Sequence, residues 1–204
     1  WGWRSIDWMR KTTCGKPSAE CPGCLRTTEG QTRKIAEWTA AYIRECGYQA
    51  TLRNSAALAS DSDLESFHAF IIAASVHQQQ HQETITAFVI AHRKLLNAKP
   101  SAFISASLSA VLEEGQTEAQ KYVDRLVSVT DWRPSMTLLL GGALRLTEYD
   151  YFQEQIVKFI VLKGGGVASS GRDRESTDWN ALTRFIDRFL HQSTADLSPA
   201  LGRA

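Results

Sequence analysis

Apolar positions along the chain alternate between short unbroken runs and longer stretches with helical spacing, starting at Gln31. Unbroken apolar runs are typical of strands buried on both faces, and they occur at 69–74, 102–106 and 137–140. Apolar residues that recur every three or four positions predict helices from Gln31 to just before Gly47, and at 82–96, 117–129 and 178–190. Residues 49–53 are compatible with a further short strand.

The order of these elements predicts an α/β fold. Strands and helices alternate and the strands are apolar throughout, which indicates a parallel sheet between two layers of helices. In open sheets of this kind the ligand lies beyond the carboxyl ends of the strands, where the strand order switches. The residues just after each strand are therefore the candidates for function.

Residues 1–24 differ from the rest, since they hold three of the four cysteines and lack any sustained period. We expect them to be a poorly ordered or non-native leader, also because the chain begins with Trp1. Cys21 and Cys24 have CxxC spacing, which leaves a redox pair or a zinc site open as alternatives. The loop-like residues before Cys21 and the lack of a fourth ligand in range favour an inert leader over both.

Composition narrows the class of protein. The net charge of +1 over 204 residues gives no basic field to attract nucleic acid. No apolar run reaches the roughly 18 residues that span a bilayer, and no secretion signal is recognisable. We expect a cytoplasmic protein, with possible peripheral contact at the inner face of the plasma membrane.

Four segments of small or hydroxyl residues follow the predicted strands or open the first helix. They are Thr27–Thr32, with sequence TTEGQT, Ser75–His77, Ser105–Leu108 and Gly141–Arg145. The first combines a glycine, hydroxyl donors and a helix start, and this predicts a cradle for a phosphate group. The alternative is that each segment is only a tight connection or a helix cap, but four in register favour a ligand site.

Two further patterns allow two interpretations each. His77 and His81 are four residues apart, a spacing that suits a metal on a helix, but a third ligand is missing and Gln78–Gln80 favours a solvated loop. Residues 149–163 carry an apolar stripe of helical spacing. This stripe predicts a helix packed on the domain or, alternatively, an amphipathic segment that lies on a bilayer or covers an apolar substrate.

These motifs resemble a known family. TTEGQT before an amphipathic helix is similar to the flavodoxin phosphate loop, with Glu29 where flavodoxins usually have threonine. GGALR at 141–145, a tyrosine-containing insertion, a glycine break and STDW at 176–179 resemble the menaquinone-dependent, flavodoxin-type protoporphyrinogen oxidases. IIAAS at 71–75 and KPSAFIS at 99–105 are similar too.

The resemblance implies a flavodoxin-like, doubly wound sheet of strand order 2-1-3-4-5 over residues 25–192. A helical insertion near 146–166 and a C-terminal tail at 193–204 complete the expected organisation. The implied cofactor is FMN, and the residues expected to hold its phosphate are Thr27, Thr28, Glu29, Gly30, Gln31 and Thr32. Those expected beside its ring are Ser75, Val76 and His77 on one side, Ser105, Ala106, Ser107 and Leu108 on the other, and Gly142, Ala143, Leu144 and Arg145 at the exposed edge.

The implied activity is oxidation of protoporphyrinogen IX to protoporphyrin IX in haem biosynthesis, with electrons passed through FMN to a membrane quinone. The alternative is a flavodoxin-like electron carrier or a general quinone reductase without a porphyrin substrate. We expect Arg145 to bind a carboxylate of the substrate, because a guanidinium group matches a carboxylate.

The sequence departs from the family at the first strand. A flavodoxin has a central strand just before the phosphate loop, and this chain has residues 21–26, CPGCLR, at that place. Pro22 lacks a backbone donor and Gly23 weakens extended structure, so a strand there is poorly supported and is expected to be atypical or missing. One hypothesis is that residues 1–25 arise from a wrong start or a frame slip. A second is that the domain is degenerate and binds no flavin.

Overall fold

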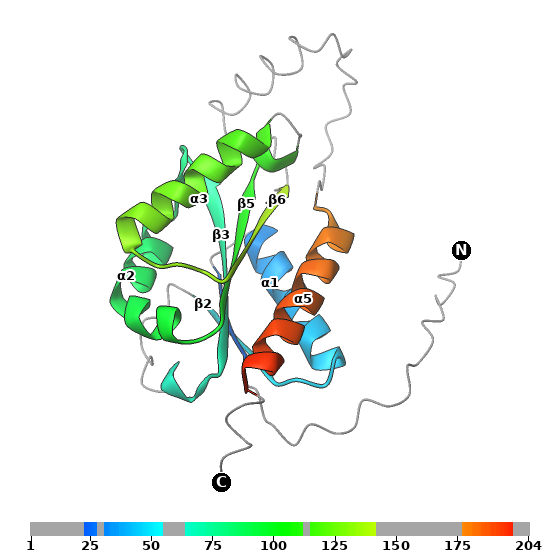
Figure 1. The fold of residues 1–204 in the computed structure, drawn as a ribbon. Coiled ribbons are helices and arrows are strands. Elements are labelled where there is room, and N and C mark those ends of the chain that lie inside the picture. Colours follow the sequence, from blue (N-terminus) through cyan, green and yellow to red (C-terminus); the bar gives the residue numbers. More distant parts are fainter. Residues whose placement is uncertain (1–22, 28–30, 55–63, 112–114, 142–176, 198–204) are drawn as a thin grey trace, which may run out of the picture.

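The computed structural model describes residues 23–27, 31–54, 64–111, 115–141 and 177–197, and these form one central sheet with helices on both faces (Figure 1). The strands are β1 (Gly23–Thr27), β2 (Ala50–Asn54), β3 (Ala69–His77), β4 (Gln80–His81), β5 (Ser101–Ser107) and β6 (Met136–Gly141). The helices are α1 (Gln31–Glu45), α2 (Glu83–Ala98), α3 (Gln116–Thr130) and α5 (Trp179–Leu197), with a 3₁₀ turn, η2, at Ser109–Val111. None of these helices is long and apolar enough to cross a membrane.

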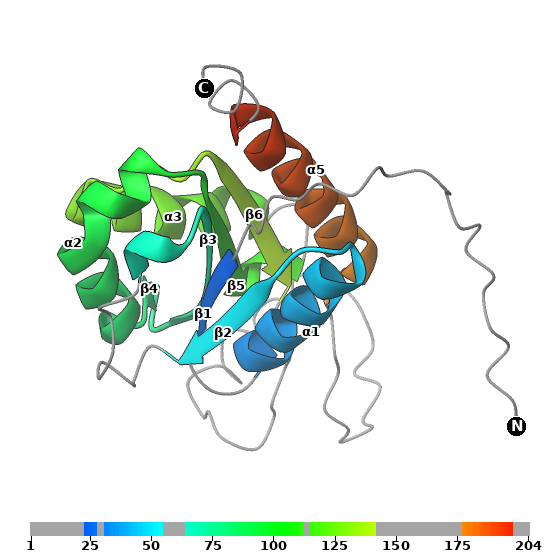
Figure 2. The same ribbon diagram turned by 90° about the horizontal axis from the view of Figure 1, so that it is seen from below.

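The strands lie in the order β2-β1-β3-β5-β6, and every pair along this path is parallel. The short β4 lies off the path and pairs antiparallel with β3. Without β4 the order is 2-1-3-4-5, which confirms the predicted doubly wound sheet (Figure 2). From β1 the chain runs first to β2 on one side and then to β3 on the other, so the switch point lies between β1 and β3.

The first strand is present, which corrects the expectation that it is missing. β1 pairs with β2 from Gly23 opposite Ala50 and with β3 from Gly23 opposite Ala69. Pro22 precedes the strand, so its missing N–H group removes no bond from the ladder of β1. Pairing with two neighbours stabilises an extended segment whose own residues favour that conformation weakly. The leader expected at 1–24 otherwise lies outside the described residues.

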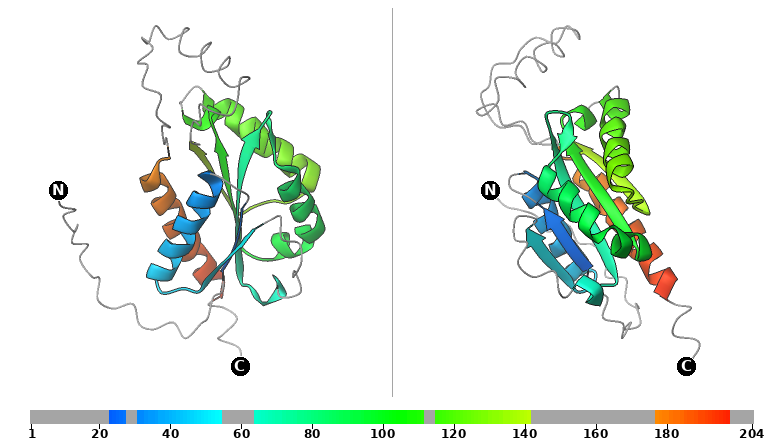
Figure 3. Two further views of the ribbon diagram at one scale, coloured as in Figure 1. Left: turned by 180° about the vertical axis from the view of Figure 1, so that it is seen from behind. Right: turned by 90° about the vertical axis from the view of Figure 1, so that its left-hand side faces the viewer.

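Alternation along the strands divides the core into two halves. In β5, Ala102 and Ile104 pack with α1 and α5 on one face, whereas Phe103 packs with α2 and α3 on the other (Figure 3). The α1/α5 half is built from alanine, isoleucine, leucine and phenylalanine. The α2/α3 half adds the fully buried Trp132 and the buried His81, Ser101 and Ser105. In the α1/α5 half the buried hydroxyls of Thr39 and Ser193 bond to carbonyls of their own helices, whereas the α2/α3 half contains polar groups that need partners from other elements.

Helix ends agree with most of the predicted boundaries. Gly47 has φ +89°, and the N–H groups of Gly47 and Tyr48 bond to the carbonyls of Arg44 and Ile43, a Schellman motif that ends α1. Asp178 caps α5 by accepting the Ala181 N–H at 2.9 Å. α5 itself runs to Leu197 rather than Leu190, and Ser193 in this extension is buried with its hydroxyl bonded to the Phe189 carbonyl.

Candidate functional site

The carboxyl ends of β1, β3, β5 and β6 meet at one edge of the sheet, together with the first residues of α1, α3 and α5 (upper edge in Figure 1). We call this the carboxyl edge. All four predicted segments begin or end there. The N–H groups at the starts of the helices are directed toward it, which favours an anionic ligand.

Thr32 carries an unpaired hydroxyl at this edge. It lies in the first turn of α1 as the last residue of the Thr27–Thr32 segment, and it is 1% exposed. Its Oγ1 has no hydrogen-bond partner among the described residues. A buried hydroxyl without a partner costs free energy, whereas a bound phosphoryl oxygen would satisfy it. Thr27 ends β1 and Gln31 begins α1, while Thr28, Glu29 and Gly30 lie outside the described residues.

Ser75, Val76 and His77 belong to β3, whereas the sequence predicted a loop after the strand. Ser75 pairs with Ala106 of β5, and Val76 and His77 form a β-hairpin with β4. β3 continues to His77 because β4 pairs with it, with Val76 opposite His81 and His77 opposite Gln80. The exposed His77 Nε2 lies 3.0 Å from Ser75 Oγ. The end of β3 therefore presents Ser75 and His77 at the carboxyl edge on extended backbone beyond the core.

The interpretation of His81 as part of a solvated loop is wrong. His81 is 7% exposed, its Nε2 lies 2.9 Å from Ser105 Oγ, and its ring meets the Phe103 ring edge-on at 5.0 Å. Burial lowers the pKa of His81 to about 4, against the opposing effect of a hydrogen bond to the Tyr122 backbone. The imidazole is therefore neutral at pH 7. Sequence reasoning missed it because polar neighbours at 78–80 and 82 gave no apolar signal.

Ser105, Ala106 and Ser107 also lie inside a strand, since β5 extends to Ser107 alongside Gly141 of β6. All three are buried. The Ser105 hydroxyl is bonded to His81, and Ser107 Oγ accepts the Ala110 N–H at 3.2 Å. Both serines thus fix the surrounding structure, while the half-buried Leu108 follows the end of β5.

The end of β6 lies beside the start of α5. Thr177 Oγ1 donates to the Gly141 carbonyl at 3.4 Å, so the two ends of the segment between them are held together. Gly142, Ala143, Leu144 and Arg145 lie outside the described residues, as does the predicted amphipathic stretch 149–163. The structure adds Gln82, whose Oε1 is buried without a partner among the described residues at the start of α2.

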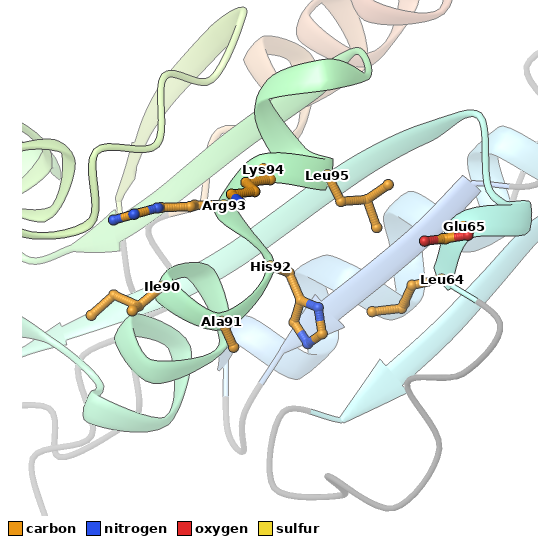
Figure 4. Close-up of a pocket in the computed structure, with 8 residues that line it drawn as sticks. All are labelled: Leu64, Glu65, Ile90, Ala91, His92, Arg93, Lys94 and Leu95. Atoms are coloured by element: carbon orange, nitrogen blue, oxygen red, sulfur yellow. The ribbon is translucent and has the colours of Figure 1, made fainter.

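Other candidate chemistry finds little support in the described ranges. They contain no cluster of three or more His, Cys, Asp or Glu side chains that could hold a metal. Cys21 lies outside them, and Cys24 lies in β1. A hollow of about 640 Å³ lies between α2 and Leu64, where the His92 ring and Leu64 are turned toward the same space (Figure 4). It is formed by the last part of α2, remote from the carboxyl edge, where such sheets bind their ligands.

The strand order and the helices on both faces of the sheet together define a flavodoxin-like domain. The model of the flavodoxin domain family matches residues 24–170, and the chain belongs to this family. A short-chain flavodoxin associated with a bacterial microcompartment shares the fold with a TM-score of 0.52 at 9% identity, covering 85% of this chain and 99% of that one. A flavodoxin of Streptococcus pneumoniae gives a TM-score of 0.51 at 13% identity over 86% and 99% of the two chains.

Curated relatives are similar over most of their length. The protoporphyrinogen IX dehydrogenase [quinone] of Escherichia coli K12 is 30% identical over 166 residues, which is 81% of this chain and 91% of the relative. The enzyme of the same name from Leishmania major is 26% identical over 179 residues, 84% of this chain and 76% of its own length. Within the flavodoxin family, the sequence is thus similar to oxidoreductases.

Proposed function

We propose that this protein is an FMN-dependent oxidoreductase that converts protoporphyrinogen IX to protoporphyrin IX and passes the electrons to a membrane quinone. The observation that carries the proposal is the 30% identity to the Escherichia coli enzyme over 91% of that enzyme's length. The unpaired, buried Thr32 hydroxyl at the start of α1 supports a phosphoryl ligand at the same place.

Each of the four predicted segments would contact a different part of FMN. Thr27–Thr32 would bind the phosphate through backbone N–H groups and hydroxyls. Ser75–His77 would lie beside one part of the ring, the Leu108 end of Ser105–Leu108 beside another, and Gly142–Arg145 at its exposed edge. When bound, FMN supplies the redox chemistry, because it accepts electrons from one substrate and donates them to another.

Binding of the substrate is assigned to Arg145. A guanidinium group fixed beside the exposed ring edge would pair with a propionate of the porphyrinogen and orient the macrocycle. Residues 149–163 would lie against the membrane surface, where the quinone is dissolved. The protein would thus work in the cytoplasm at the inner face of the membrane, with no role in binding nucleic acid.

Flavin binding is the first test. The purified protein should be yellow, and apoprotein titrated with FMN should quench flavin fluorescence to a saturating value. Apoprotein that binds no FMN would contradict the proposal and support the hypothesis that the domain is degenerate and binds no flavin.

The substrate is the second test. Under anaerobic conditions, the FMN-loaded protein should convert protoporphyrinogen IX to the fluorescent porphyrin only when a quinone is present. Quinone reduction with other electron donors, but without porphyrin formation, would identify the electron carrier or general quinone reductase instead.

Arg145→Ala tests the role of that side chain. Loss of a charged hydrogen bond is worth about 1.5–3 kcal/mol, so we expect KM for the porphyrinogen to rise by roughly 10- to 100-fold with unchanged FMN affinity. Arg125→Ala, at an exposed position of α3, is the matched control. Loss of FMN in Arg145→Ala would refute the assignment to substrate.

A further inference from the structure

The hairpin that carries Val76 and His77 is held by few contacts of its own, because the pairing of β3 with β5 ends at Ser75 opposite Ala106. β4 has only two residues, and it pairs with β3 through Val76–His81 and His77–Gln80. A two-stranded hairpin of this length has little stability by itself. Its position at the carboxyl edge must come from contacts with the rest of the domain.

The turn of the hairpin is also strained. Gln78 has φ 49° and Gln79 has φ 63°, so both central residues adopt the left-handed conformation that a type I′ turn requires. Asparagine and glycine adopt this conformation readily, whereas glutamine has no short side chain to stabilise it. The local backbone therefore works against the hairpin, and another interaction offsets that strain.

His81 supplies that interaction. Its ring is buried between Phe103, whose ring centroid is 5.0 Å away, and α3, where it bonds to the Tyr122 backbone. Its Nε2 bonds to Ser105 Oγ at 2.9 Å. One side chain thus connects the second strand of the hairpin to β5 and to α3, and both of these are firmly packed elements.

We propose that His81 is a positioning residue, which together with Ser105 anchors the strained hairpin and thereby fixes Val76 and His77 beside the flavin ring. The proposal rests on the proposed function, since it assigns the hairpin to the FMN site. His81 acts through the hairpin and does not touch the cofactor. The Ser105 hydroxyl has the same role, as the partner of the imidazole and not of the ring.

The first experiment compares three variants with a control. His81→Phe keeps a ring of similar size without nitrogen atoms, Ser105→Ala removes the partner hydroxyl, and His81→Gln retains a polar group in place of Nε2. His68→Gln, at an exposed position before β3, is the control. The readouts are the FMN dissociation constant of each apoprotein, from quenching of flavin fluorescence at pH 7, and hydrogen exchange of the hairpin amides.

We expect His81→Phe to weaken FMN binding about tenfold, because the buried hydrogen bond between His81 and Ser105 is lost. Ser105→Ala should have a smaller effect in the same direction, and His81→Gln should recover most of the affinity. Exchange should accelerate at Val76 and His77 in the first two variants but not in β5. If His81→Phe does not fold, Ser105→Ala removes a single hydroxyl and carries the test.

A second experiment separates positioning from other roles. The double change Gln78→Asn with Gln79→Gly gives the turn its preferred residues, so the hairpin should hold without its anchor. Added to His81→Phe, it should restore slow exchange and FMN affinity together. Slow exchange without recovery of affinity would overturn positioning as the role of His81.

The outcomes distinguish the two proposals. If the wild-type apoprotein binds no FMN, the proposed function fails, while hydrogen exchange still reports whether His81 anchors the hairpin. If the wild type binds FMN and His81→Phe equals it in both affinity and exchange, the anchor is refuted and the proposed function stands.

Discussion

The two edges of the sheet differ in whether their buried polar atoms have hydrogen-bond partners. At the amino edge, the Trp132 indole N–H donates to Ser101 Oγ at 3.0 Å, and the Ser135 hydroxyl donates to the Ser101 carbonyl at 2.8 Å. Lys99 Nζ, nearby, donates to the Phe67 carbonyl at 2.6 Å. At the carboxyl edge, Thr32 Oγ1 and Gln82 Oε1 are buried without partners among the described residues.

This difference indicates which edge serves stability and which serves binding. Both edges belong to the same strands, so sheet geometry alone does not explain the contrast. A buried polar atom without a partner destabilises the free protein by about 1–3 kcal/mol. Such atoms are retained where a ligand supplies the missing hydrogen bond. The strained Gln78–Gln79 turn lies at the same edge. The contrast therefore supports the proposed site at the carboxyl edge without reference to any relative.

The largest effect is expected from Trp132→Ala at the amino edge. Trp132 is 0% exposed and packs edge-on against Phe103 at 5.5 Å. Its removal should lower the free energy of unfolding by about 3–5 kcal/mol through the cavity left behind. Urea denaturation measures this, and the folded fraction should bind FMN as the wild type does. A small loss of stability with a large loss of FMN affinity would contradict the division between the edges.

The next effect is the pH dependence that His81 confers. Its pKa is about 4 in the folded protein and about 6.5 when unfolded, so the unfolded state binds more protons between these values. Stability is therefore complete above about pH 6.5 and falls by about 3 kcal/mol as the pH drops to about 4. Urea denaturation of wild type and His81→Gln measures it as a difference, which removes the contribution of the carboxyl groups. Parallel pH profiles would contradict the burial of a neutral imidazole.

Periodicity predicted the fold well because buried strands and amphipathic helices leave strong local signals. The runs at 69–74 and 102–106 lie inside β3 and β5, and α2 buries Ile85, Phe88, Val89 and Leu96 at the helical spacing that predicted the helix. β1 was undervalued because its stability comes from pairing with β2 and β3. Pairing between distant segments leaves no signal in a window of five residues.

The position of the candidate site could be proposed from the sequence, but the contacts that support it could not. Small residues after strands indicated the carboxyl edge, and the hydroxyl of Thr32 lies there unpaired. The hydrogen bond between His81 and Ser105 joins residues 24 positions apart in the chain, and no local sequence pattern predicts such a contact. The last residues of β3 and β5 were likewise not predicted as strand, because they are extended only through pairing with β4 and β6.

A smaller effect, confined to the carboxyl edge, is expected from Thr32→Val. Valine has nearly the same shape without the unpaired hydroxyl, so the apoprotein should gain up to about 1 kcal/mol. FMN affinity should fall about tenfold, the equivalent of about 1.4 kcal/mol. Fluorescence titration and thermal unfolding of the apoprotein measure the two quantities.

Thr39→Val is the matched control for that change. Thr39 is also buried in α1, but its Oγ1 donates to the Ile35 carbonyl at 2.8 Å. Its loss should leave FMN affinity unchanged and should not stabilise the apoprotein. Equal behaviour of the two threonine variants would remove the special role given to Thr32.

The smallest effect is expected from Gln79→Gly, which relieves strain at the carboxyl edge alone. Glycine adopts φ 63° without the steric conflict that a Cβ atom causes. Thermal unfolding should therefore show a gain of up to about 1 kcal/mol, the cost of one left-handed residue. Gln80→Gly, in the adjacent strand β4, should instead destabilise, because glycine weakens extended structure. If both changes destabilise equally, the turn is not strained, and the hairpin needs no anchor at His81.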